Sequence, residues 1–298
     1  MTELATPGSY GEPPRGYRLP AATHLGPVKL QVADLEQSIE WYHRVLGFHA
    51  SSLSSDGAWL TPDGTDHVLV ELVERPGAKP GGVDRRLGLF HFAILLPDRA
   101  SLASFARHIS DSAEHAGASD HVVSEAFYLH DPDGLGIEVY ADRPRETWQR
   151  VDRELVMGTE PLNIRDLLAT PHAPWRGMPA GTTMGHMHLH VGDLDKAAEF
   201  FSETLGFDRI VLRYPGALFM SAGGYHHHLG TNTWAGPDAR EPREDDARLL
   251  EWTIVLPSHD DVTQLTDVLS RAGAPVALDS NSIVTRDPWG TAIRIRPA

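Results

Sequence analysis

The chain has 298 residues, enough for one large domain or two ordinary domains, and 41% of them are hydrophobic. Its 41 acidic residues exceed its 26 basic residues, and the formal charge of −15 argues against nucleic acid or an anionic membrane as a partner. There is no cysteine, which excludes disulfides, thiolate catalysis and iron–sulfur clusters, so nitrogen and oxygen atoms must hold any metal.

Residues 1–22 are rich in proline and glycine and lack an apolar core. We expect them to form a flexible N-terminus that is neither a signal peptide nor a membrane anchor. No later stretch approaches the roughly 18 continuous apolar residues of a membrane-spanning helix. The sequence therefore predicts no membrane partner and a cytoplasmic location.

Two segments share one pattern, VKLQVADLEQSIEWYHRVLGF at 28–48 and MHLHVGDLDKAAEFFSETLGF at 187–207. Each begins as a short alternating strand, continues as an amphipathic helix and ends in Leu-Gly-Phe. Asp34 and Asp193 occupy the positions expected for helix N-caps, and Gly47 and Gly206 the positions where a left-handed residue ends the helix. The pattern predicts a strand–helix unit that occurs at least twice.

Two weaker copies begin at His91 and Glu251, and short strand candidates follow all four helices. The repeat is a βαβββ module, expected at about residues 26–75, 89–142, 184–234 and 249–298. We group these modules into a first domain at 23–142 and a second domain at 184–298, joined by a connector at 143–183. One module cannot bury both faces of its small sheet, so we predict an α+β fold whose modules pair into half-barrel clefts.

This repeat resembles the vicinal-oxygen-chelate superfamily, which includes glyoxalase I, bleomycin-resistance proteins and extradiol dioxygenases. In that superfamily the opening of the first strand and the middle of the last strand of a module supply metal ligands. The first-strand positions, seven residues before Asp34, Asp98, Asp193 and Ser258, are Pro27, His91, His186 and Glu251. The last-strand positions are Glu71, Glu138, a residue of the 225–228 run and Arg294.

The resemblance implies that His91, Glu138 and His186 of modules two and three hold a metal. Two imidazoles and one carboxylate form the facial triad of non-haem iron(II) oxygenases. Modules one and four offer no imidazole and an arginine, which indicates a structural cleft. One competing arrangement stays open: if modules three and four pair, His186, Glu251 and a histidine of the 226–228 run form a similar set.

The segment HVVSEAFYLHDPDGLGIE at 121–138 resembles the extradiol ring-cleavage signature. His121, Tyr128, the turn at 131–134 and Glu138 match that signature, and Ser119 departs from it outside the reacting groups. The turn should place Tyr128 and Glu138 on adjacent strands. The stretches GHMHLHVGDL and AGGYHHHLGTNTW carry a closer likeness to the catechol-2,3-dioxygenase branch.

The resemblance implies Fe(II)-dependent extradiol cleavage of a small aromatic diol by O2, giving a ring-opened semialdehyde. Tyr128 and His121 would hydrogen-bond a substrate oxygen. We assign the acid or base beside the oxygen site to His228, with His226 as the second choice, because both would share one face of a strand. Mn(II) accepts the same ligands as Fe(II).

Two other functions fit the same fold. A glyoxalase-like isomerase or lyase would favour four protein ligands with two glutamates around nickel or zinc, whereas the predicted cleft offers one glutamate. A metal-free drug-sequestering protein would usually lack the histidines. Exposed strand edges in half-barrels also favour association of copies into a homo-oligomer.

Overall fold

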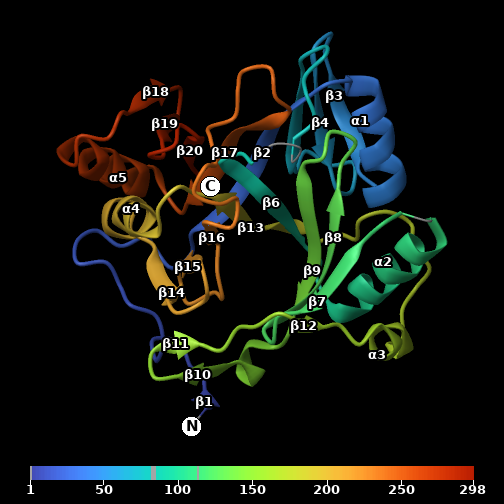
Figure 1. Cartoon of the computed structure of the whole chain (residues 1–298), viewed down its shortest axis with the longest axis horizontal. Coiled ribbons are helices and arrows are strands. Elements are labelled where there is room, and N and C mark those ends of the chain that lie inside the picture. Colours follow the sequence, from blue (N-terminus) through green and yellow to red (C-terminus); the bar gives the residue numbers. More distant parts are fainter. Residues whose placement is uncertain (1, 82–84, 113) are drawn as a thin grey trace.

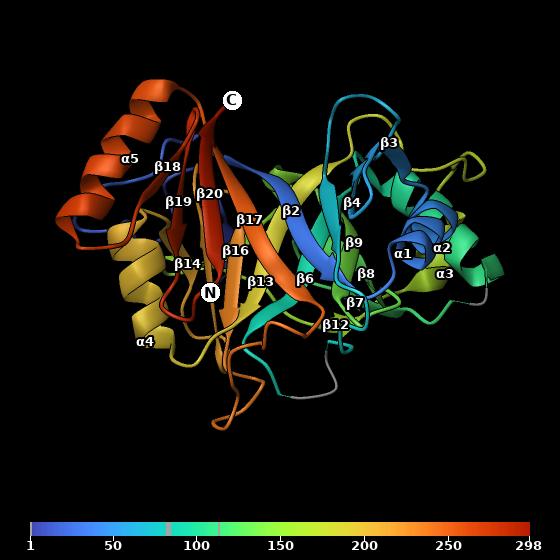
Figure 2. The ribbon, with the colours of Figure 1, turned by 90° about the horizontal axis from the view of Figure 1, so that it is seen from above.

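The computed structural model describes residues 2–81, 85–112 and 114–298. Two large twisted sheets lie against each other in the middle of the molecule, with α4 (Leu194–Ala197) and α5 (His259–Arg271) at one end. At the other end lie α1 (Leu35–Trp41), α2 (Arg99–Ser112) and α3 (Ile164–Ala169) (Figures 1 and 2). Mixed sheets with few helices confirm the predicted α+β class.

The four βαβββ modules are confirmed, and their strands are as follows. Module one contains β2 (His24–Val32), β3 (His49–Leu53), β4 (Gly57–Thr61) and β5 (Val70–Glu74), and module two contains β6 (Gly88–Leu95), β7 (Gly117–Asp120), β8 (Ser124–His130) and β9 (Gly136–Asp142). Module three contains β13 (Thr183–His190), β14 (Asp208–Val211), β15 (Ala217–Ser221) and β16 (Leu229–Asn232), and module four contains β17 (Arg248–Leu256), β18 (Ala277–Asp279), β19 (Ser282–Arg286) and β20 (Ala292–Pro297).

The strong helices begin and end where the sequence indicates. Asp34 accepts a hydrogen bond from the Gln37 amide and Asp193 one from the Lys196 amide, both at 2.9 Å, so both are N-caps. Helices α1 and α4 continue as the π-helical turns η1 (Tyr42–Leu46) and η3 (Ala198–Thr204). Gly47 ends η1 with a φ of 73°, and its α-carbon lies so close to Gly177 that a β-carbon would clash.

The modules pair across the two halves of the chain. One sheet has the order β12-β7-β8-β9-β6-β13-β16-β15-β14 and therefore joins modules two and three through β6 and β13. The other has the order β18-β19-β20-β17-β2-β5-β4-β3 and joins modules four and one through β17 and β2. Modules three and four thus do not form the competing cleft, whereas the grouping of the chain into two domains by halves stays a prediction.

The connector and the N-terminal segment both carry ordered structure. The connector contains η2 (Arg145–Thr147), β10 (Gln149–Val151), β11 (Glu154–Leu155), β12 (Glu160–Pro161) and α3. In the segment expected to be flexible, β1 (Glu3–Leu4) pairs with β10, Glu12 pairs with Arg209, and the Tyr10 hydroxyl donates to the Gly224 carbonyl at 2.5 Å.

Alternation along the strands separates the core from the cleft. On β13, Met187 and Leu189 are fully buried in the main hydrophobic core, while His186 and His188 point to the opposite face. On β9, Ile137 and Val139 enter the same core, so Glu138 faces the cleft from a strand that is buried on both sides. The hydrophobic effect on one face therefore fixes the direction of the polar side chains on the other.

Candidate metal centre and substrate cavity

Three neighbouring strands bring the predicted metal ligands together. His91 on β6, Glu138 on β9 and His186 on β13 each offer a ligand atom, and these atoms all lie within 4.8 Å of one another. The Nε2 atoms of His91 and His186 lie 3.0 Å and 3.1 Å from Oε2 of Glu138. All three side chains are almost fully buried. The three residues form the only such cluster among the described parts of the chain.

The orientation of these groups fits a metal ion. Nε2 of His91 is buried and makes no hydrogen bond, because its approach to Glu138 has a suitable distance but poor alignment. A buried ring nitrogen without a partner destabilises the folded chain unless a bound ligand or metal ion pairs with it. Two imidazoles and one carboxylate on three adjacent strands match the facial ligand set that leaves open positions on a divalent transition metal.

The protonation states also suit metal binding. Burial lowers the pKa of the His186 imidazole to about 4, against the opposing effect of the Glu138 carboxylate. Burial alone would raise the pKa of Glu138, but the His186 and His91 side chains outweigh it and hold that pKa well below its ordinary range. At neutral pH the site thus presents a neutral imidazole lone pair and a carboxylate, the forms that bind metals.

A cavity of about 220 Å³ opens directly beside the three residues. It is smaller than the roughly 300–1,000 Å³ of sites for drug-sized ligands, which suits a single-ring molecule. Its walls combine aromatic rings with a few polar groups, and its lining is Phe90, His91, Ser119, His121, Tyr128, Glu138, Met157, Gly158, Thr159, His186, His188, Tyr214, Phe219, His227 and Trp234.

Tyr128 and His121 form a hydrogen-bonded pair in the wall of the cavity. Tyr128 lies directly opposite Glu138 on the paired strands β8 and β9, as the turn at 131–134 predicts. Nδ1 of His121 lies 2.7 Å from the Gly158 carbonyl oxygen and must donate to it, so in the neutral ring Nε2 accepts from the Tyr128 hydroxyl at 2.5 Å. The Tyr128 oxygen is therefore left as an acceptor toward the cavity.

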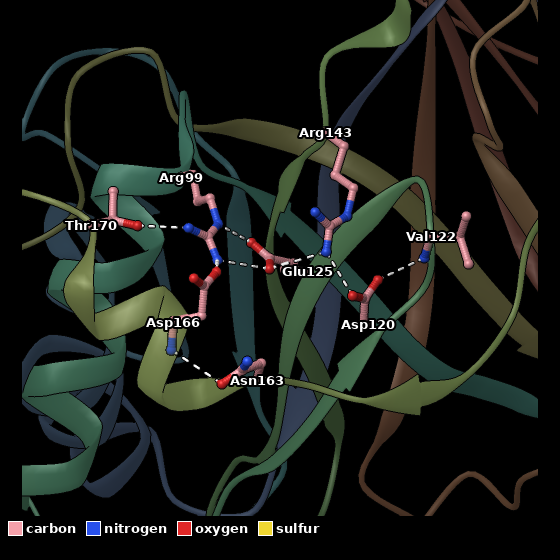
Figure 3. Close-up of polar contacts among 8 residues, drawn as sticks. All are labelled: Arg99, Asp120, Val122, Glu125, Arg143, Asn163, Asp166 and Thr170. Carbon is pink, nitrogen blue, oxygen red and sulfur yellow. Dashed lines mark hydrogen bonds and ion pairs between the residues drawn. The ribbon is translucent and has the colours of Figure 1, made fainter. Parts of the chain in front are cut away.

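An ionic network around the buried Glu125 carboxylate fixes the turn that carries His121 (Figure 3). The Asp120 carboxylate accepts from the Val122 amide at 2.8 Å and pairs with Arg143 at 2.6 Å, so it holds the backbone on both sides of His121. The Glu125 carboxylate is almost fully buried, and it accepts hydrogen bonds from Arg143 at 3.1 Å and from Arg99 at 2.5 Å. Arg99 also bonds Asp166 and Thr170, which ties this turn to α3.

The three consecutive histidines lie in the loop between β15 and β16, so the predicted strand at 226–228 is wrong. The chain turns through the two left-handed glycines Gly223 and Gly224, and alternation does not apply to it. His227 lines the cavity, and its ring centroid lies 4.0 Å from that of His186. His226 and His228 are absent from the cavity lining, and His228 accepts from the Ala222 amide at 3.2 Å through Nδ1.

Comparison with known proteins places the chain in a family. A family model described as the Glyoxalase/Bleomycin resistance protein/Dioxygenase superfamily matches residues 24–139 and 183–295. The chain belongs to this superfamily. The predicted resemblance is thus confirmed.

The protein "Catechol-2,3-dioxygenase" of Bacillus subtilis (strain 168) is 44% identical over 271 residues, which are 89% of this chain and 94% of that protein. "Biphenyl-2,3-diol 1,2-dioxygenase 3" of Rhodococcus globerulus is 31% identical over 118 residues, 38% of this chain and 60% of that protein. The first relative confirms the prediction of an enzyme similar to catechol-2,3-dioxygenases.

The likeness to solved structures supports the fold and nothing beyond it. A protein from Bacillus subtilis strain 168 matches with a TM-score of 0.65 at 13% identity, over 94% of this chain and 86% of that one. Glyoxalase I from Zea mays matches with a TM-score of 0.53 at 18% identity, over 92% of each chain. Among the described residues, no helix is both long and apolar enough to cross a membrane.

The second superfamily cleft, between modules one and four, has ion pairs where the first has imidazoles. Glu251 lies 2.6 Å from Arg294, and Glu71 lies 3.8 Å from Lys29. Pro27 stands at the position of His91. Glu251 is therefore engaged within the sheet of modules one and four, and it does not join His186.

The sequence reasoning missed the contribution of the connector to the cavity. Met157, Gly158 and Thr159 line it, and the Thr159 hydroxyl lies 2.8 Å from that of Tyr214, another lining residue. Phe219 and Trp234 line the cavity as apolar walls, whereas Trp252 is buried in the core. A connector defined only by proline and arginine content gives no signal for such a contact.

Proposed function

We propose that this chain opens the ring of catechol-type substrates by extradiol cleavage, with O2 as co-substrate and Fe(II) held by His91, Glu138 and His186. The main observation in support is that two imidazoles and one carboxylate face a small cavity lined by aromatic rings. The "Catechol-2,3-dioxygenase" relative at 44% identity supports the same reaction. When bound, Fe(II) would acidify the substrate hydroxyls and supply the one-electron chemistry that O2 requires.

Tyr128 and His121 orient the substrate. Since the Tyr128 proton is directed to Nε2 of His121, its oxygen accepts a hydrogen bond from a substrate hydroxyl. Phe90, Phe219 and Trp234 provide apolar surface for the ring and limit the access of water.

His227 is the residue placed to move a proton. Nε2 of His226 donates to the Asp142 carboxylate at 2.9 Å, which leaves Nδ1 of a neutral His226 as an acceptor. Nδ1 of His227, 2.7 Å away, must therefore donate to it, and Nε2 of His227 keeps a free lone pair. We assign the acid–base role to His227 in place of His228, and a positioning role to His226.

The test uses protein prepared without oxygen, loaded with Fe(II) or Mn(II), and mixed with catechol or 3-methylcatechol in aerated buffer. We expect the yellow absorbance of a semialdehyde together with O2 consumption in the wild type. Glu138→Ala should lose both signals, and Glu251→Ala, its matched variant in the other cleft, should keep them. Bound iron without any O2 consumption would reject the proposal and leave an isomerase or a metal-dependent binding protein.

A further inference from the structure

Strands β17 and β2 pass beside β6 and β13 (Figure 2). Residues of these four strands line a second hollow. Its volume is about 1070 Å³, compared with about 220 Å³ for the substrate cavity. Phe90 and Trp234 line both spaces, and their rings meet edge to face with 5.7 Å between centroids. These two side chains thus form the wall between the substrate cavity and the larger hollow, which we call the groove.

The groove is basic although the chain has a formal charge of −15. Among the described residues that line it, six are Lys or Arg and three are Asp or Glu. Two of these acids already have arginine partners, because Asp246 lies 3.0 Å from Arg86 and Glu251 lies 2.6 Å from Arg294. A concave basic surface on an acidic protein raises the local concentration of anions.

Three of the basic side chains belong to one face of a single sheet. Lys29 lies opposite Glu251, Glu251 opposite Ala292, and Ala292 opposite Arg286. Residues that are directly opposite on paired strands share a face, so Lys29 and Arg286 point to the same side. Arg248 lies opposite Gln31, two residues beyond Lys29, and therefore joins them on that face.

Arg248 and Arg286 are available for a ligand. Within the described residues Arg248 has no ion pair, and its Nε is buried without a hydrogen-bond partner. Arg286 donates from Nη1 to the Gly290 carbonyl at 2.7 Å and has no carboxylate partner among the described residues. We propose that the groove is a binding site for small organic carboxylates, with Arg248 and Arg286 as the main contacts and Lys29 as a supporting charge.

The choice of an organic carboxylate rests on the proposed function. Extradiol cleavage turns a neutral diol into a carboxylate, and this anion would form behind the wall made by Phe90 and Trp234. The groove on the other side of that wall offers guanidinium groups beside the apolar ring of Trp289. Its ligand is therefore a short conjugated carboxylate of the product class, held outside the catalytic cavity.

The test is calorimetric titration of metal-free protein with muconate, a stable six-carbon dienedicarboxylate, at low ionic strength. We expect wild-type binding that weakens about tenfold or more in Arg248→Gln and in Arg286→Gln, because each removes charge-assisted hydrogen bonds. Arg271→Gln, at the exposed end of α5, removes the same charge elsewhere and should bind as the wild type does. The dimethyl ester of muconate should not bind.

Three results would overturn the site: no heat at millimolar muconate, equal weakening in Arg271→Gln, or weakening by His227→Gln but not by the groove variants. Because the titration needs neither metal nor turnover, its outcome is separate from that of the activity test. Muconate binding that depends on Arg248, in a protein that consumes no O2 with catechol, would retain the carboxylate site and reject the proposed reaction.

Discussion

The Tyr140 hydroxyl occupies the space next to the α-carbon of Gly185. A β-carbon added at position 185 would lie 1.9 Å from the Tyr140 oxygen. Gly185 is the extra residue of the bulge where β13 changes register against β6, directly before the ligand His186. Tyr140 follows Glu138 by two residues on β9 and donates or accepts a 2.6 Å hydrogen bond with Tyr225. The contact between the Tyr140 side chain and the Gly185 backbone therefore sets the spacing of the two metal ligands Glu138 and His186.

Gly185→Ala should damage both stability and metal binding. The methyl group must displace the buried Tyr140 ring or the β13 backbone, which we expect to cost roughly 1–3 kcal/mol in unfolding free energy. Moving His186 should also weaken metal affinity about tenfold or more. Denaturant unfolding and iron titration measure the two effects. Gly117→Ala, whose β-carbon would meet Tyr128 at an ordinary 3.6 Å, is the control and should leave both close to wild type.

Much of the fold can be predicted from the sequence because strand alternation and helix caps are local signals. The modules, the caps at Asp34 and Asp193 and the equivalent positions of His91 and His186 within their modules all follow from short segments of the chain. The opposition of Tyr128 and Glu138 follows from the turn between them. Such features depend on residues that are close in sequence, and no long-range contact has to be known.

The remaining features depend on contacts between distant segments. His227 lies at the cavity because Gly223 and Gly224 turn the loop there, which alternation does not predict. The approach of Thr159 to Tyr214 requires the connector to fold back on module three. Glu251 matches the ligand pattern in the sequence, but its side chain pairs with Arg294 on the neighbouring strand.

The three consecutive histidines give a test of proton transfer. His227→Gln should lower kcat for catechol by about 100-fold or more, the usual effect of losing a general acid or base, with little change in KM. His228→Gln should retain kcat within about threefold, since among the described residues its ring is hydrogen-bonded only to the Ala222 amide. Steady-state kinetics under saturating O2 measure both. A large kcat loss confined to His228→Gln would return the role to that residue.

Glu125→Gln should destabilise the turn that carries His121. The substitution leaves two arginines, Arg99 and Arg143, facing a neutral amide in a buried position. Their side chains stay about one third exposed (33% and 34%) and keep other carboxylates, so we expect a loss of roughly 1–3 kcal/mol, below the full cost of breaking a buried pair. Glu3→Gln, which removes an exposed partner of Arg150, should change the unfolding free energy by less than about 0.5 kcal/mol.

Val122→Gly should stabilise the protein or leave it unchanged, although glycine usually weakens a folded chain. Val122 has a φ of 72°, a left-handed conformation that is strained for a β-branched residue by roughly 1–3 kcal/mol. Relief of this strain offsets the larger entropy of glycine in the unfolded chain, about 1 kcal/mol. Val151→Gly is the matched control, with similar exposure and no positive φ, and it should destabilise. Equal destabilisation in both variants would contradict the proposed backbone strain at Val122.

Asp131 should make stability depend on pH. Burial raises the pKa of its carboxyl from 3.8 to about 7, against hydrogen bonds donated by the Leu135 and Asp133 amides. An acid with a higher pKa in the folded chain binds its proton more tightly when folded. The contribution of Asp131 to the free energy of unfolding is therefore complete below about pH 4 and is lost as the pH rises through about 7.

Asp131→Asn keeps an oxygen for both amides, and its nitrogen can donate to the Tyr42 hydroxyl in place of the present 3.3 Å contact. Relative to the wild type, this variant should gain stability between pH 4 and 7 by at most about 1.4 kcal/mol per pH unit. Urea unfolding at several pH values measures the difference. Asp63→Asn is the control, because hydrogen bonds from Thr65 lower the pKa of that exposed carboxyl, so it is ionised in the folded and the unfolded chain over this range and its difference should stay nearly flat. A flat difference for Asp131→Asn across this range would mean that the buried carboxyl is already ionised at pH 5 and is held by the turn amides.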